Sequence, residues 1–206
     1  MTEQPDVSRE TKERLEVYLD LLAKWNPTIN LVSKNSLNNI WSRHLIDSIQ
    51  LSEIMNAPTG HWADIGSGGG FPGLVIAILA SASKSPMSVT LVESDSRKCA
   101  FLRTVIRETG ISARVLNDRI EALDGLDADV LSARALADLD TLLGFADRHL
   151  KRSGTAIFPK GATWKKELEV AQRKWFFDLH LAKSKTDADA VIMAITGVSR
   201  VRSNAP

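Results

Sequence analysis

The stretch DIGSGGGFPG, Asp64 to Gly73, decides the fold, because five of its ten residues are glycine. It follows HWADI, which has the pattern of a strand, and it precedes GLVIAILA, which has the pattern of a buried helix. A glycine run in this context predicts a strand-to-helix turn rather than a flexible linker. In open α/β sheets ligands bind at the carboxyl ends of strands, and glycines let the backbone pass close beneath them.

Two classes of cofactor use such a turn. The dinucleotide fingerprint G-x-G-x-x-G is met by Gly68, Gly70 and Gly73, but glycine-rich sequence fits many patterns. The competing pattern, acidic-x-G-x-G-x-G, starts at Asp64 and Gly66 and is the first motif of class I S-adenosylmethionine methyltransferases. The acid favours the second class. A carboxylate would repel a diphosphate at this turn, whereas it suits the ammonium and sulfonium of S-adenosylmethionine.

A second acid, Glu93, ends the next strand candidate, VTLVESD. An acid at this point commonly accepts hydrogen bonds from ribose hydroxyls. It would serve NAD and S-adenosylmethionine equally, so it predicts a nucleoside ligand without choosing between them. The sequence contains no P-loop, so we do not expect hydrolysis of a nucleoside triphosphate.

From residue 61 onward short β-like runs alternate with helical ones, which predicts a mostly parallel sheet covered by helices on both faces. We expect strands at 61–65, 88–93, 113–116, 128–132, 155–159, 176–183 and 190–196, and helices at 72–82, 96–109, 120–123, 136–150 and 164–175. The predicted fold class is therefore α/β, with a Rossmann-like sheet of seven strands.

The residues before this sheet predict an N-terminal helical extension. Residues 8–25 form one amphipathic pattern, which we expect Asn26-Pro27 to end because proline disfavours helix at the residue before it. Residues 37–55 form a second helical pattern. We therefore expect an extension over 1–58 packed on a methyltransferase domain over 59–206.

Composition places the chain among ordinary soluble proteins, with 44% apolar and 25% charged residues in 206. The apolar runs are short and the N-terminus is acidic and polar, so we expect no membrane span and no secretory signal. Cys99 is the single cysteine, which fits a reducing cytoplasm. The four histidines are scattered without ligand spacing, so we expect no metal.

Charge is unevenly distributed although the net charge is only +1. Residues 1–20 carry six acidic and three basic side chains, while 97–119 carry six basic against two acidic and 147–174 carry eight against three. These basic segments are either solvated helix faces or the footprint of a polyanionic partner.

Seven motifs together resemble one family, the bacterial 16S rRNA guanine-N7 methyltransferases, also called the glucose-inhibited division protein B family. They are NPTINLVS, RHLIDS, DIGSGGGFPG, ESDSRKCAFL, DRIEAL, SARALADL and FPKG. The resemblance runs from about Trp25 to the end of the chain. It implies a class I fold, S-adenosylmethionine as cofactor, and methylation of N7 of the guanine at position 527 of small-subunit rRNA.

The resemblance also implies cofactor-binding residues. Gly66 and Phe71 should line the cofactor pocket, Ile120 and Glu121 in DRIEAL should lie at its adenine end, and Arg134 in SARAL should face both cofactor and substrate. Many relatives have alanine where Ile120 stands. A backbone contact to adenine would survive that change, whereas a tight side-chain fit would not.

The expected partner is 16S rRNA in the small subunit, bound by a monomer. Lys160 in FPKG is the first candidate for a phosphate contact, and Lys165 and Arg97 are further candidates. Trp164 or Phe71 is placed to stack on an extruded base. Under the family resemblance His44 and Asp47 belong to a helical lid over the catalytic face, and otherwise they form a local polar pair.

Guanine N7 carries a lone pair and loses no proton on methylation, so no strong general base is expected. Attack on a pyrimidine carbon would need a cysteine nucleophile, but Cys99 lies inside a predicted helix and is interpreted as a packing residue. Other hypotheses stay open at this point: a methyltransferase for a small molecule or protein, a nucleotide-binding regulatory module, and a cofactor-binding rRNA chaperone.

Overall fold

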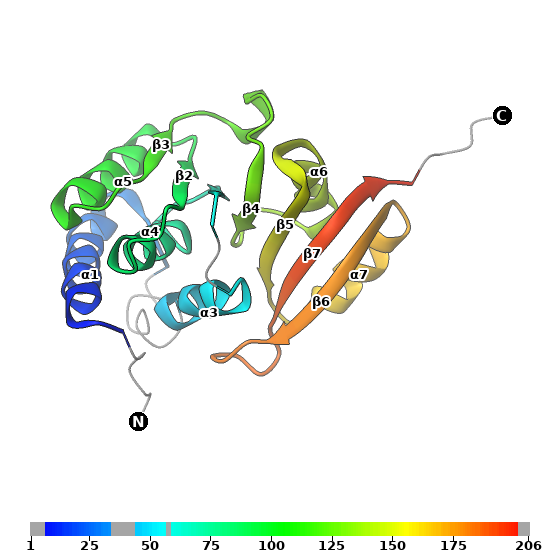
Figure 1. Cartoon of the computed structure of the whole chain (residues 1–206), viewed down its shortest axis with the longest axis horizontal. Coiled ribbons are helices and arrows are strands. Elements are labelled where there is room, and N and C mark those ends of the chain that lie inside the picture. Colours follow the sequence, from blue (N-terminus) through cyan, green and yellow to red (C-terminus); the bar gives the residue numbers. More distant parts are fainter. Residues whose placement is uncertain (1–6, 34–43, 57–58, 202–206) are drawn as a thin grey trace.

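The structure is a computed structural model that describes residues 7–33, 44–56 and 59–201 (Figure 1). The helices are α1 (Arg9–Ile29), α3 (Ile46–Ile54), α4 (Gly73–Ala82), α5 (Ser96–Thr109), the 3₁₀ turn η2 (Ile120–Ala122), α6 (Leu139–His149) and α7 (Trp164–Gln172). The strands are β1 (His61–Ile65), β2 (Ser88–Val92), β3 (Arg114–Leu116), β4 (Ala128–Ala133), β5 (Leu150–Lys160), β6 (Trp175–Lys183) and β7 (Val191–Arg200).

The seven strands form one sheet in the order β3-β2-β1-β4-β5-β7-β6. Strands β1 to β5 pair in parallel, and β7 pairs antiparallel with both β5 and β6. Strand order reverses between β1 and β4, and this switch point lies at the glycine run. The predicted α/β class with a seven-stranded, mostly parallel sheet is confirmed.

Helices cover both faces of the sheet. Helices α1, α3, α4 and α5 enclose one apolar core, which includes Trp62 of β1 and Phe101 of α5. Helices α6 and α7 enclose the other core, which includes Ile65 of β1 and Phe158 of β5. Because side chains alternate along β1, its neighbouring residues serve opposite cores. None of the helices in the described ranges has the length and apolar character that a membrane span needs.

The prediction that Asn26-Pro27 ends the first helix is wrong. Helix α1 continues through Pro27 to Ile29 and stops where Asn30 adopts a left-handed conformation, with φ of 49°. Pro27 lies in the last turn, so its missing N–H costs one hydrogen bond at most. Burial of Ile29 and a hydrogen bond from the Val32 N–H to the Asn26 Oδ1 (2.8 Å) offset that loss.

The segment after β4 also differs from the prediction of a helix over 136–150. Helix α6 begins at Leu139, with the Asp138 side chain accepting a hydrogen bond from the Thr141 N–H. The residues before it form a turn in which Ala135 has φ of 52°. Helix α7 is shorter than predicted because β6 begins at Trp175. Residues 37–43 of the second predicted helix lie outside the described residues, and the remainder forms α3.

Candidate active site

The glycine run forms a close turn between β1 and α4. Gly66 has φ of +65°, and a Cβ added there would lie 2.6 Å from a methyl carbon of Leu136. A Cβ on Gly73 would lie 2.7 Å from Oδ2 of Asp64. A side chain at Gly66 would push the loop away from the segment after β4, so glycine is required there by both conformation and space. At Gly73 space alone requires glycine, because a Cβ would also meet Leu91.

Asp64 lies beneath this turn and is fully buried. Its carboxylate accepts hydrogen bonds from the hydroxyl of Ser132 (2.7 Å) and the N–H of Gly73 (3.3 Å), and Ser132 itself accepts one from Trp62 Nε1 (2.8 Å). Burial raises the pKa of Asp64 to about 6, although these hydrogen bonds favour the ionised form. Its side chain thus joins β1, β4 and the start of α4.

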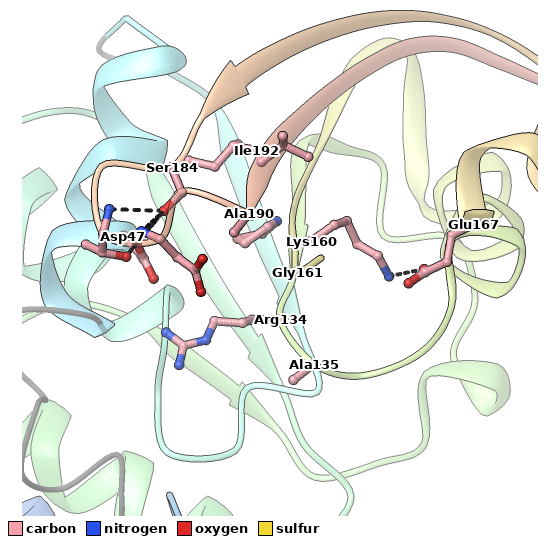
Figure 2. A pocket seen from close by; sticks show the side chains of 13 residues that line it. Asp47, Arg134, Ala135, Lys160, Gly161, Glu167, Ser184, Ala190 and Ile192 are labelled. Atoms are coloured by element: carbon pink, nitrogen blue, oxygen red, sulfur yellow. Dashed lines mark hydrogen bonds and ion pairs between the residues drawn. The ribbon is translucent and has the colours of Figure 1, made fainter. Parts of the chain in front are cut away.

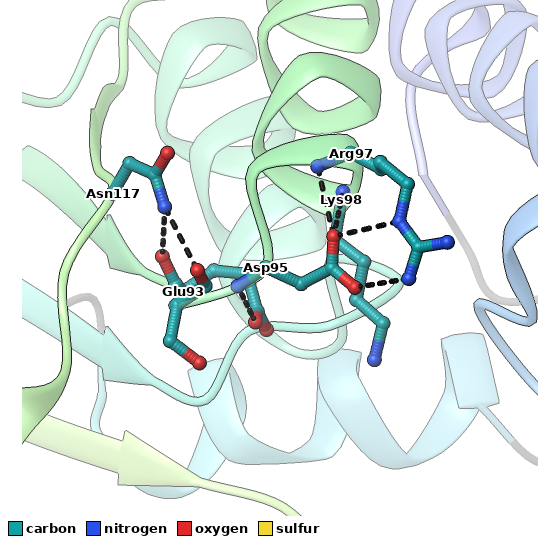
Figure 3. A network of polar contacts seen from close by, with 6 residues as sticks. Glu93, Asp95, Arg97, Lys98 and Asn117 are labelled. Carbon is teal, nitrogen blue, oxygen red and sulfur yellow. Dashed lines mark hydrogen bonds and ion pairs between the residues drawn. The ribbon is translucent and has the colours of Figure 1, made fainter.

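Glu93 holds the other side of the turn. Its two carboxylate oxygens accept hydrogen bonds from the backbone N–H groups of Gly68 (2.9 Å) and Asp95 (2.8 Å). Figure 3 shows the network beyond it, in which Asn117 Nδ2 donates to the carbonyls of Glu93 (3.2 Å) and Ser94 (3.0 Å). Asp95 caps α5 and pairs with the guanidinium of Arg97 at 2.8 Å, and this pairing lowers the pKa of Asp95.

A cavity of about 370 Å³, here called the loop cavity, opens over this network at the carboxyl ends of β1 and β2. It brings together five of the predicted cofactor residues, from three separate parts of the sequence. These are Gly66, Gly68, Glu93, Ile120 and Glu121. The rest of its lining is Val92, Ser94, Lys98, Asp118, Arg119, Ala135, Leu136, Ala137, Thr141 and Phe145.

A second cavity of about 250 Å³, here called the Arg134 cavity, lies beside the first (Figure 2). Its wall comes from the ends of β4 and β5, the start of β7, the β6–β7 loop and α3. The lining residues include Asp47, Arg134, Ala135, Lys160, Ser184 and Thr186. Ala135 lines both cavities, so the turn after β4 forms the wall between them.

Arg134 is held from the side of the N-terminal helices. Its Nη2 donates a hydrogen bond to Nδ1 of His44, and its guanidinium carbon lies 5.6 Å from the centre of the Phe71 ring. The Phe71 ring also packs on Tyr18 and His44, with centroid distances of 5.2 and 5.3 Å. Phe71, predicted in the cofactor pocket, is therefore buried under the loop among these side chains, where it supports Arg134.

Lys160 lines the Arg134 cavity, and its ion pair and hydrogen bond are with other parts of the protein. Its side chain is only 9% exposed, and its ammonium pairs with Glu167 at 2.5 Å and donates to the Ala137 carbonyl at 3.1 Å. Lys165 is exposed, with its ammonium 5.5 Å from the ring centre of Trp164, and Trp164 packs against the core. The two exposed candidates, Lys165 and Arg97, begin helices at the same edge of the sheet as the cavities.

Comparison with known proteins identifies the family. Residues 11–191 match the family rRNA small subunit methyltransferase G. The chain belongs to this family. It is 59% identical over 197 residues to the ribosomal RNA small subunit methyltransferase G of Ruegeria pomeroyi, covering 95% of this chain and 96% of that relative. The corresponding protein of Paracoccus denitrificans is 51% identical over 193 residues, covering 93% and 97%.

Solved structures agree with the fold at low sequence identity. A TehB-like SAM-dependent methyltransferase from Corynebacterium glutamicum matches with a TM-score of 0.56 and 18% identity, covering 91% of this chain and 97% of that one. A SAM dependent methyltransferase from Aquifex aeolicus matches with a TM-score of 0.58 and 12% identity, covering 86% and 96%. The family resemblance of the motifs and the predicted fold are thus both confirmed.

The sequence did not indicate several contacts that shape the site. Tyr18 of α1 donates a hydrogen bond of 2.5 Å to the carbonyl of Gly69, 51 residues away. The structure joins His44 to Arg134 and Asp47 to Thr186 (2.5 Å), contacts that cross 90 and 139 residues. Helical spacing placed His44 and Asp47 on one face, but it could not name these distant partners. Cys99 is buried, as interpreted, and its thiol donates to the Glu93 carbonyl.

Proposed function

We propose that the protein transfers a methyl group from S-adenosylmethionine to N7 of guanine 527 in 16S rRNA. The observation that carries this proposal is the pair of cavities that share Ala135 at the carboxyl edge of the sheet. One cavity is lined by five of the residues predicted to bind the cofactor, and the other, which Arg134 lines, is proposed to receive the base. Membership of the rRNA small subunit methyltransferase G family supports RNA as the substrate class.

The loop cavity fits S-adenosylmethionine. The carboxylate of Glu93 is fixed by two backbone N–H groups and retains acceptor capacity for ribose hydroxyls. Ile120 and Glu121 lie where the adenine would bind, and Gly66 leaves space that a side chain would fill. Asp64 acts indirectly in this proposal, since it holds the loop from below.

In this proposal the residues of the site hold the cofactor and the base in position, and they do not transfer a proton. S-adenosylmethionine supplies an electrophilic methyl group on a sulfonium, and guanine N7 already carries the lone pair that attacks it. Methylation leaves a positive charge on the purine, so a carboxylate in the cavity wall is an appropriate neighbour. Arg134, fixed by His44 and Phe71, presents hydrogen-bond donors to the acceptor edge of the base.

The proposal extends to the protein's organisation and setting. We propose that residues 1–58 act as an extension of a catalytic domain over 59–206, that the protein works as a monomer in the cytoplasm, and that no metal takes part. Among the described residues no cluster of three or more His, Cys, Asp or Glu side chains has the arrangement of a metal site.

Mass-spectrometric mapping of 16S rRNA tests the proposal. Cells lacking this protein should lose N7-methylguanine at position 527, and the wild-type gene should restore it. Arg134→Ala should restore it poorly while the protein stays folded. Persistence of the modification in the deleted strain would refute the assignment, and so would transfer by the purified protein to a free metabolite without rRNA.

A further inference from the structure

The segment between β3 and β4 connects two strands that β2 and β1 separate in the sheet. Its regular structure is the 3₁₀ turn η2, in which the Ala122 N–H donates to the Arg119 carbonyl (3.0 Å) and the Leu123 N–H to the Ile120 carbonyl (3.3 Å). The last carbonyls of a helical turn have no partners within it. A turn this short therefore depends on neighbouring elements for its support.

Arg148, in the last turn of α6, supplies part of that support. Its Nη1 donates a hydrogen bond to the Glu121 carbonyl (2.9 Å), and its Nη2 donates one to the Leu123 carbonyl (2.5 Å). A guanidinium is planar and carries its donors in a fixed fork, so one side chain can bridge two carbonyls of the same turn. These contacts join residues that are 27 and 25 positions apart in the sequence.

The same end of α6 meets this segment at two further points. A Cβ added to Gly125 would lie 3.2 Å from the carbonyl oxygen of Arg148, so the two backbones are close. His149 is fully buried. Burial and the charge of Arg148 lower the pKa of its imidazole, and the nearby backbone of Ile120 and Asp124 raises it in part. The end of α6 and the segment are therefore packed against each other.

The supported turn forms one wall of the loop cavity. Ile120 and Glu121 line the cavity from η2, and Thr141 and Phe145 line it from α6. Arg148 lies further along the same helix and, in the part of the chain that the structure describes, is outside this lining. Its effect on a ligand of the cavity therefore passes through the turn that it holds.

We propose that Arg148 is a positioning residue for the adenine of S-adenosylmethionine, because it holds the backbone of η2 in the conformation that binds the base. This inference rests on the proposed function, which places the adenine at Ile120 and Glu121. A turn that is ordered before the ligand arrives loses little conformational freedom on binding, and the ligand then binds more tightly. Without the guanidinium, the carbonyls of Glu121 and Leu123 would bind water, and the turn would become ordered only with the adenine in place.

The test compares two ligands that differ at the adenine. S-ribosylhomocysteine has a hydroxyl group in place of the adenine of S-adenosylhomocysteine, so the ratio of their dissociation constants measures what the adenine contributes. In Arg148→Ala the dissociation constant for S-adenosylhomocysteine should rise about tenfold, the equivalent of one hydrogen bond to a charged group. The constant for S-ribosylhomocysteine should stay unchanged. Calorimetry on the full chain measures the first constant directly and the second by competition.

Two further variants separate positioning from general stability. Arg148→Lys keeps the charge but has a single ammonium in place of the fork, so it should restore the ratio in part, and it provides the measurement if Arg148→Ala fails to fold. Arg152→Ala is the matched control, because Arg152 is an exposed arginine nearby in β5, and it should keep both constants. Urea unfolding of each variant shows whether the protein is folded where binding is measured. A purely structural role of Arg148 would weaken the binding of both ligands together.

The outcomes separate the inference from the proposed function. If the wild-type protein binds neither ligand, the proposed function fails. If the wild-type protein binds S-adenosylhomocysteine more tightly and Arg148→Ala keeps the wild-type ratio, the function stands and the inference is overturned, whether or not both constants rise. The inference is also overturned if the wild-type protein binds the two ligands equally, because the adenine then contributes nothing.

Discussion

At the scale of single residues, Asp64 shows how the acid of a motif holds a glycine turn in place. It is buried beneath the glycine run, and its hydrogen bonds go to Ser132 and Gly73. The pKa of about 6 means that the folded protein holds the carboxyl proton more tightly than the unfolded chain does, where the ordinary value is 3.8. Ionisation of Asp64 therefore opposes folding, fully above pH 6 and not at all below about pH 3.8.

We predict that Asp64→Asn removes this dependence on pH. The free energy of unfolding of the variant relative to wild type should rise between pH 4 and pH 7.5, by up to about 3 kcal/mol at 1.36 kcal/mol per pH unit. Urea unfolding of both proteins across this range measures it. Loss of a hydrogen bond would change the free energy of unfolding of the variant by the same amount at every pH. A difference between variant and wild type that is constant across this range would therefore show that Asp64 stays ionised in the folded protein.

The sequence predicted that Asp64 and Glu93 both bind the cofactor, and the structure places their side chains on different sides of the glycine run. Both end neighbouring strands, which spacing reveals, and both contact the glycine run. Only Glu93 lines the loop cavity, because Asp64 precedes the turn and its side chain points to the face that carries α4. Side chains alternate between the two faces of a strand, and the face that α4 covers is known only from the packed structure. The motif alone therefore does not show on which side of the turn the Asp64 side chain lies.

At the scale of elements, helix α1 supports the site from outside the sheet. The Tyr18 hydroxyl donates to the Gly69 carbonyl, and its ring packs on Phe71 and Phe101. Tyr18 is fully buried, and burial raises the pKa of its hydroxyl well above the ordinary value, so it remains a donor at every accessible pH. The extension is thereby attached to the middle of the cofactor loop.

Tyr18→Phe should loosen this attachment. The buried carbonyl of Gly69 would lose its partner, which costs about 1–3 kcal/mol of folding free energy. If the contact also positions the loop, affinity for S-adenosylhomocysteine should fall several-fold, measured by calorimetry beside urea unfolding. Val17→Ala, at an exposed neighbouring position, is the control. Reduced stability with unchanged affinity would limit Tyr18 to a structural role.

Local pattern predicted the core elements well and the segments around the site poorly. His61–Ile65 and Ser96–Thr109 have the bounds that the sequence predicted, because apolar periodicity and capping residues are local signals. Residues 136–138 of the turn after β4 were predicted as helix, since SARALADL contains several good helix formers. In the structure Ala135 is left-handed and Leu136 lies against Gly66, a tertiary contact that local pattern does not contain.

At the scale of the whole molecule, the parallel sheet collects functional groups at one edge. Helices α4, α5, α6 and α7 all begin at the carboxyl ends of strands, where both cavities open. Sequence spacing predicted that ligands bind at this edge of the sheet. It could not show which basic side chains are exposed there and able to contact phosphate. The ammonium of Lys160 forms an ion pair with Glu167, whereas Lys165 at the start of α7 is exposed.

This difference predicts the salt dependence of RNA binding. Each phosphate contact contributes roughly one to the slope of log affinity against log salt. Lys165→Ala should lower the slope for small-subunit rRNA by about 1, and Arg97→Ala should lower it less, because Asp95 competes for that guanidinium. Arg152, exposed near the start of β5 at the opposite edge, is the matched control and should leave the slope unchanged. A larger effect of Arg152→Ala than of Lys165→Ala would place the RNA on the wrong edge for methyl transfer.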